Sequence, residues 1–248
     1  MKFKNCRCAH CLVDFEALTS DHAFPRSWYP ASTPQNLEKW QAPCCERCNN
    51  RMSKMEEDLL TRLGLCIDPT APECSGIAEK VLRSVNPEHA KNEKDKRSRE
   101  AKLRKIGSSL KPLSSAKPDQ TLIAFSSAPS GPLIEIDRKL LEQFGEKFIR
   151  GITYAIDGSY IEDDYDITVS HIVVPIDEFD TLAKQHCELH ERGPGLVFFM
   201  GRATDDLNSK MFLIRIFGSL VLRAIVLPKE YAEKADARIE KERQNQSH

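Results

Sequence analysis

The sequence predicts an α+β protein with three parts: a cysteine-rich N-terminal domain, a basic linker, and a C-terminal α+β domain with an antiparallel sheet. Three observations predict this class. Six of the nine cysteines fall within the first 48 residues. Helix-like and strand-like patterns follow one another in blocks, ending in a run of strands, which is typical of α+β folds. Charge also divides the chain, with a net of +5 over residues 1–120 and −6 over residues 121–248.

Composition limits the classes of protein that this chain can be. Its 248 residues suit one large domain or two small ones, and its formal net charge of −1 names no partner. No apolar run reaches the roughly 18 residues of a membrane helix, so no membrane contact is expected. The first ten residues, MKFKNCRCAH, lack the apolar stretch of a secretory signal. We therefore expect a cytoplasmic protein, whose clustered thiols are metal ligands rather than disulfides.

The N-terminal domain is expected to span residues 1–88 and to contain two amphipathic helices after its cysteine-rich start. Leu59, Leu60 and Leu63 share one helical face in EEDLLTRLGL. A second helix is predicted in GIAEKVLRSV, and Asn86-Pro87 should end it. Residues 89–120 lack core residues and end in Ser, Pro and Gly, so we interpret them as a linker whose basic first half could be a solvated helix.

The C-terminal domain is expected over residues 121–230, followed by a charged tail at 231–248. Apolar residues at helical spacing predict a helix in LLEQFGEKFIRGITYAI. ITVSHIVVPI is β-branched and is expected to form a strand, and EFDTLAKQHCELHE to form a helix. Three further strands are predicted in GLVFFMGRA, KMFLIRIF and SLVLRAIVL, with Gly218-Ser219 as a turn. Helices packed on one side of this meander would complete the domain.

Two CxxC pairs carry the clearest chemical signal in the chain. They are Cys8–Cys11 and Cys45–Cys48, separated by 33 residues. Four thiolates satisfy a tetrahedral zinc ion completely and leave no open position for catalysis, so we expect a structural zinc. Cys6 or Cys44 could replace a neighbour in this set, and that alternative stays open.

Between and after these pairs lie Asp21-His22-Ala23-Phe24-Pro25-Arg26-Ser27, then Asn36-Leu37, then Asn49-Asn50. CxxC, DHxxPRS, NL and CxxCNN in this order resemble the HNH endonucleases of the ββα-metal type. The resemblance covers about residues 6–63. It implies a hairpin and a helix that together grip one divalent ion, with zinc tying the flanking turns. Here the last letter of the motif is Asn49 in place of His.

The resemblance also implies a role for each matched residue. His22 would be the general base that takes a proton from the attacking water, a task that an ordinary pKa near 6.5 suits. Asp21 and Asn49, with Asn50 as the alternative to Asn49, would bind a catalytic Mg²⁺ or Mn²⁺ through oxygen. Asn36 would hold the loop that orients His22. Phosphate contacts are expected from exposed basic residues near the motif, namely Arg26, Arg51 and Lys54.

These expectations lead to a metal-dependent nuclease that hydrolyses phosphodiester bonds in DNA and leaves 5′-phosphate and 3′-hydroxyl ends. Host defence and mobile-element biology are both settings that use such a module. Two alternatives stay open: a zinc-stabilised domain that binds DNA without cutting it, and a nuclease autoinhibited by its C-terminal domain. The acidic C-terminal domain is expected to contact a protein or a small molecule, and a homo-oligomer stays open.

Overall fold

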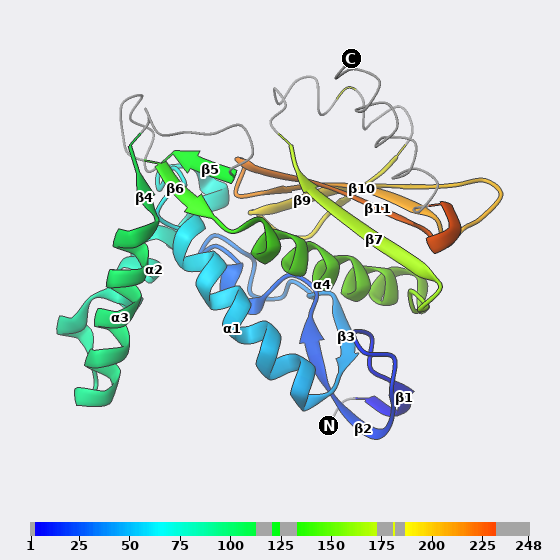
Figure 1. The fold of residues 1–248 in the computed structure, drawn as a ribbon, viewed down its shortest axis with the longest axis horizontal. Coiled ribbons are helices and arrows are strands. Elements are labelled where there is room, and N and C mark those ends of the chain that lie inside the picture. The colour runs from blue at the N-terminus through cyan, green and yellow to red at the C-terminus, as the bar shows by residue number, and fades with distance from the viewer. Residues whose placement is uncertain (1–2, 113–120, 125–132, 173–180, 182–186, 232–248) are drawn as a thin grey trace, which may run out of the picture.

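The computed structural model describes residues 3–112, 121–124, 133–172, 181 and 187–231 (Figure 1). These residues form a mixed α+β structure whose sheets are antiparallel, which confirms the predicted class. The long helix α4 (Arg138–Asp157) lies between the N-terminal sheet and the large C-terminal sheet (Figure 1). Within the described part of the chain, none of the helices is both long enough and apolar enough to cross a lipid bilayer.

The N-terminal sheet has the order β1-β2-β3, with strands β1 (Phe3–Arg7), β2 (Asp14–His22) and β3 (Gln41–Cys44). The last residue of β2, His22, pairs with the first residue of β3, Gln41. Helix α1 (Glu46–Leu63) starts directly after β3, because the Cys45 sulfur accepts a hydrogen bond from the Cys48 backbone and caps its N-terminus. The result is a strand pair followed by a helix.

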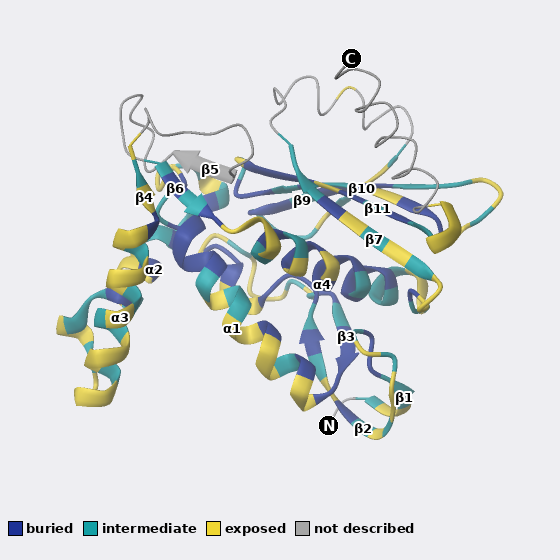
Figure 2. Cartoon of the chain, viewed as in Figure 1, coloured by how far each residue is buried: buried dark blue, intermediate teal, exposed yellow. Residues whose placement is uncertain are grey.

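The other helices of the N-terminal half lie before and after α1. They are η1 (Arg26–Trp28) within the β2–β3 loop, η2 (Pro72–Cys74), α2 (Ile77–Val85), η3 (Pro87–His89) and α3 (Glu93–Ser109). Helix α2 ends at Val85, directly before Asn86-Pro87, as the sequence predicts. The basic helix α3 is mostly exposed (Figure 2), yet Lys102 pairs with Glu57 and Lys105 with Asp58 of α1. The charge of the expected linker is therefore partly neutralised within the molecule.

The large C-terminal sheet has the order β7-β11-β10-β9-β8. Its strands are β7 (Tyr165–His171), β8 (Glu188–Glu191), β9 (Leu196–Arg202), β10 (Lys210–Ile216) and β11 (Leu220–Pro228). The predicted turn between the last two strands is present, with Gly218 at a φ of 70° that glycine adopts without strain. A second small sheet pairs β4 (Leu110–Lys111) and β5 (Thr121–Ala124) with β6 (Leu133–Ile136).

One sequence expectation is wrong where the structure describes it. Residues 178–191 were expected to be helical, but Glu188–Glu191 form β8, which pairs with β9 at the edge of the sheet. Hydrogen bonding to a neighbouring strand outweighs a local helical pattern here. Residues 173–180 and 182–186, which include most of the rest of that segment and the end of the expected strand before it, lie outside the described residues, as do residues 232–248 of the tail.

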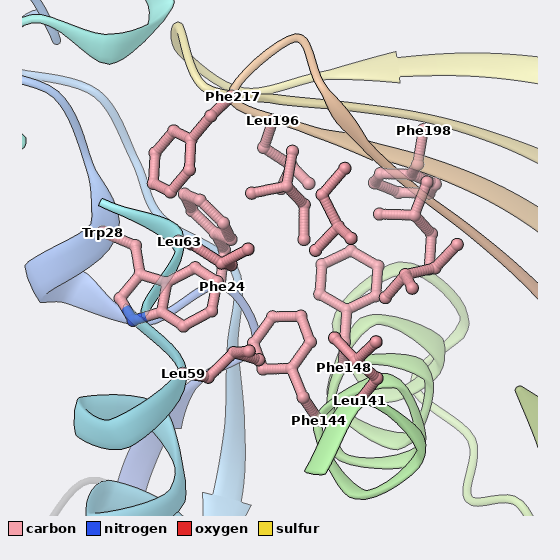
Figure 3. Close-up of a cluster of buried hydrophobic side chains, with 14 of the residues drawn as sticks. Phe24, Trp28, Leu59, Leu63, Leu141, Phe144, Phe148, Leu196, Phe198 and Phe217 are labelled. Carbon is pink, nitrogen blue, oxygen red and sulfur yellow. The ribbon is translucent and has the colours of Figure 1, made fainter. Parts of the chain in front are cut away.

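A single hydrophobic cluster contains residues from both sides of the expected linker (Figure 3). Trp28 stacks on Phe144 of α4 with 4.6 Å between ring centroids, and Phe148 contacts Phe198 of β9 edge-on. Gly151 lets α4 approach the end of β2, since a Cβ there would lie 3.1 Å from that of Ala23. The expected domain boundaries stay a prediction, but the core is continuous across them.

Candidate functional site

Four cysteines come together where the β1–β2 turn meets the start of α1. Their sulfur atoms, from Cys8, Cys11, Cys45 and Cys48, all lie within 4.8 Å of one another. Zn–S bonds of about 2.3 Å in a tetrahedron place sulfurs about 3.8 Å apart, so this group could hold a metal ion such as zinc. These are the four cysteines that the CxxC spacing indicates. Neither Cys6 nor Cys44 belongs to the group.

Hydrogen bonds at the start of α1 favour a thiolate within this group. The pKa of Cys8 falls to about 3, because the Cys44 thiol and the Cys45 backbone N–H donate to its sulfur. The pKa of Cys48 is instead raised, mainly because the thiol is buried and secondly because it is hydrogen-bonded to the Cys45 side chain. Four anionic sulfurs at this separation would repel one another, and a bound divalent cation removes that repulsion.

A second polar group lies where β2, α1 and α4 meet. Lys147 of α4 places its buried ammonium 3.1 Å from Asp21 Oδ2 and 2.9 Å from Glu56 Oε1. The carbonyl oxygens of His22 and Ala23 accept further hydrogen bonds from the same ammonium. His10, inside the first CxxC pair, lies with Nε2 3.2 Å from Asp21 Oδ2. We call Lys147, Asp21, Glu56 and His10 the Lys147 cluster.

The two carboxyl groups of the Lys147 cluster respond differently to burial. Burial is the largest influence on Asp21 and opposes ionisation, but His10 and Lys147 together hold its pKa below the ordinary value. For Glu56 burial outweighs the attraction of Lys147, so its pKa is raised. Asp21 is therefore the principal counter-ion of the buried ammonium.

His22 faces away from the Lys147 cluster because neighbouring residues of a strand point to opposite faces of the sheet. Its side chain lines a hollow of about 640 Å³. We call this the His22 hollow; its lining includes Arg26, Leu37, Glu38, Lys39, Trp40, Gln41 and Arg192. Three of these residues are cationic and one is acidic.

The surroundings of His22 favour a neutral imidazole. Burial lowers its pKa below the ordinary 6.5, and the charges of Lys147, Arg26 and Lys39 lower it further, while Asp21 opposes them. The amide nitrogen of Gln41 lies 3.1 Å from His22 Nε2. Because an amide nitrogen only donates, this contact favours the tautomer in which Nε2 accepts and Nδ1 carries the proton. A neutral imidazole at neutral pH is the form that can take up a proton.

The other residues expected from the resemblance are distributed more widely. Arg26 lies in the His22 hollow, whereas Arg51 lines a smaller cavity of about 140 Å³ beside His10 and Lys147. Asn49 is half-buried in the first turn of α1, where its backbone carbonyl accepts a hydrogen bond from Ser53. Asn36 and Lys54 are exposed. The structure thus brings His22 and Arg26 together and places Asp21 on the opposite face.

Sequence reasoning missed several residues of both sites: Lys147, Glu56, His10, Lys39, Gln41 and Arg192. One of them had a readable signal. Lys147 interrupts the apolar face of its helix between Phe144 and Phe148, and a lysine in such a place is buried only when it is paired. The others lie at ordinary positions in the sequence, and only the tertiary fold brings them to the sites.

The described chain is therefore a mixed α+β protein with an antiparallel sheet and a four-cysteine cluster able to bind a metal ion. Comparison with protein-family models, with curated proteins and with solved structures gives no match.

Proposed function

We propose that this chain is a metal-dependent endonuclease of the HNH type that hydrolyses phosphodiester bonds in DNA, with His22 as the general base. The observation that supports the proposal is the place of His22. It stands at the end of β2, where its surroundings favour a neutral imidazole, in a hollow whose lining includes three cationic side chains and one acidic one. The strand pair and helix that carry it are joined by the four-cysteine cluster. Cationic groups around a base suit a phosphodiester substrate.

The proposal includes a divalent ion at Asp21, which would stabilise negative charge in the transition state. The oxygen-rich surroundings of Asp21 suit a hard cation such as Mg²⁺ or Mn²⁺. In the present arrangement these oxygens already surround the ammonium of Lys147. Ion binding at Asp21 therefore needs Lys147 to withdraw. Asn49 is the second ligand that the motif implies.

This contact favours a second candidate function, a nuclease that its C-terminal half keeps inactive. Lys147 belongs to α4, outside the segment that resembles the nuclease module, and its positive charge repels a divalent ion from Asp21. A trigger that moves α4 would free the carboxylate. The two candidates share one reaction and differ in whether the isolated chain is active.

Replacing His22 with alanine is expected to abolish cleavage of supercoiled plasmid in Mg²⁺ or Mn²⁺. General bases contribute about 10²- to 10⁴-fold in rate, so a loss of at least about 100-fold is expected. Nicking is followed on agarose gels, with EDTA lanes and with zinc content measured for each protein. His89→Ala, at an exposed histidine of η3, is the matched control. Equal cleavage by His22→Ala and wild type would contradict the proposed role. If the plasmid stays intact with every folded protein, a gel-shift assay follows. It separates a restrained nuclease from a non-cleaving DNA-binding module.

The acid limb of the pH–rate profile is expected to lie below pH 6.5. A general base must be unprotonated, and the His22 pKa is lowered, so activity should persist as pH falls to 6.5 and be lost only below it. Gln41→Glu is expected to move this limb to higher pH, because a carboxylate beside the imidazole stabilises its protonated form. Gln35→Glu makes the same charge change at an exposed position and should leave the limb unchanged. An unshifted limb in Gln41→Glu would argue against His22 as the titrating base.

A further inference from the structure

The His22 hollow contains one cation from a part of the chain that the nuclease-like motif does not include. Arg192 follows β8 of the large C-terminal sheet, whereas Arg26 and Lys39 belong to the β2–β3 loop. Arg192 therefore brings the C-terminal half to the face on which His22 lies. The only acidic residue among those that line the hollow is Glu38.

Contacts to backbone and aromatic groups hold the Arg192 guanidinium in place. Its carbon Cζ lies 4.8 Å from the ring centroid of Trp40, and Nη1 donates to the Glu38 carbonyl oxygen at 2.8 Å. The Glu38 carboxylate is 3.6 Å from Nη1, but its side chain is 90% exposed, so water screens this pair strongly. Much of the arginine charge thus remains available to an anion, while its position is set by groups that carry no charge.

The loop after Arg192 packs tightly against the segment that precedes β3. Gly193 has a φ of 81°, and a Cβ there would lie 2.9 Å from Leu37 Cδ2. A Cβ at Gly195 would likewise lie 3.1 Å from the ring of Pro30. These close approaches fix the loop, and with it Arg192, relative to the strand that ends in His22. A cation held in this way loses little entropy when it binds a phosphate.

Building on the proposed function, we propose that Arg192 is a substrate-contact residue. It binds a phosphate of a nucleic-acid strand that crosses the His22 hollow, next to the phosphodiester on which His22 acts. A guanidinium offers paired donors to phosphate oxygens, which suits this task better than a point charge. The volume of the hollow, about 640 Å³, admits a short stretch of one strand. Both halves of the chain then form the substrate site.

The alternative role for Arg192 is structural, as a link between the C-terminal loop and Trp40. The two roles predict different results, because a structural link affects stability and a phosphate contact affects affinity and its salt dependence. Binding is therefore measured in the His22→Ala protein, which cannot cleave, by fluorescence anisotropy with a labelled single-stranded oligodeoxynucleotide. No Mg²⁺ or Mn²⁺ is added, the zinc is left in place, and the melting temperature of each variant is recorded.

Adding Arg192→Ala is expected to weaken binding about tenfold. The slope of log affinity against log salt should fall by about one, the contribution of one phosphate contact. Arg138→Ala is the matched control: this arginine pairs with Glu142 at the start of α4, about 25 Å along the helix from Ala155, which lines the hollow. It should change affinity by less than about twofold.

A variant with the opposite expected effect on affinity tests the same inference and keeps Arg192 in place. Glu38→Gln removes the acid from the hollow and is expected to tighten binding about threefold, whereas Glu142→Gln changes net charge equally and should not. If Arg192→Ala and Glu38→Gln match their controls while the oligonucleotide still binds, the inference is overturned and the proposed function stands. If the protein binds no oligonucleotide even at low salt, both fail together.

Discussion

Replacing Cys8 by serine is expected to abolish zinc binding and to unfold the N-terminal sheet. The buried residues of the small cluster that supports this sheet are Cys8, Leu18, Cys44, Cys45, Cys48 and Met52, so little apolar area stabilises it without an ion. Structural zinc contributes on the order of 10 kcal/mol in small domains. That is as large as the whole stability of many proteins. Zinc content by atomic emission and the far-ultraviolet circular dichroism spectrum are the measurements.

The control for this prediction is Cys6→Ser, which changes a half-buried cysteine outside the four-sulfur group. It should retain about one zinc per chain and melt within a few degrees of wild type. A chelator strong enough to remove zinc should reproduce the Cys8→Ser spectrum in the wild-type protein. Retention of stoichiometric zinc by Cys8→Ser would contradict the assignment of the four ligands.

Lys147→Met is expected to destabilise the protein by about 3–5 kcal/mol. Methionine replaces the apolar stem of lysine but carries no charge, so the buried Asp21 and the partly buried Glu56 lose their cation, and an uncompensated buried charge costs about that much. Without the ammonium the pKa values of both carboxyl groups should rise. Stability is then lost as pH increases through those raised values, so the deficit should be larger at pH 8 than at pH 5. Urea denaturation at the two pH values measures both effects.

The same variant tests whether Lys147 occupies a cation site. Mn²⁺ should stabilise Lys147→Met, by about 2.7 kcal/mol at 100 times the dissociation constant, and should affect wild type less. If the chain is a restrained nuclease, Lys147→Met should also cleave plasmid faster than wild type. Lys139→Met, at an exposed position of the same helix, is the control and should change stability by less than about 0.5 kcal/mol. A loss below about 1 kcal/mol in Lys147→Met would show that the ammonium is not the partner of these carboxylates.

Local patterns predicted much of the secondary structure because the residues that determine it are neighbours in sequence. Helix α4 follows from the spacing of Phe144, Phe148 and Ile152, and α2 ends directly before Asn86, as predicted. The failure at Glu188–Glu191 has a tertiary cause, since its strand exists only through pairing with β9. Edge strands are stabilised by a partner that the local sequence does not contain.

For the candidate site too, the sequence predicted one part and the tertiary structure decided the other. The spacing of two CxxC pairs predicted four sulfurs that could share one ion, because two residues between cysteines bring both sulfurs of a turn together, but it left Cys6 and Cys44 as alternatives that only the fold excluded from the group. It did not determine the environment of Asp21 and His22. These neighbours in sequence lie on opposite faces of β2, one against a buried ammonium and the other in a cationic hollow.

The sequence by itself thus determined that His22 stands next to Asp21, and it correctly predicted the α+β class and the two CxxC pairs. Only the tertiary structure decided that Lys147 reaches Asp21 from a helix more than 120 residues away in the sequence. It also decided that Arg192, which follows β8 of the large C-terminal sheet, lines the His22 hollow. The physical reason is that ion pairs and shared cavities depend on distance in space. Spacing along the chain reports distance in space only within a turn, a helix or a strand.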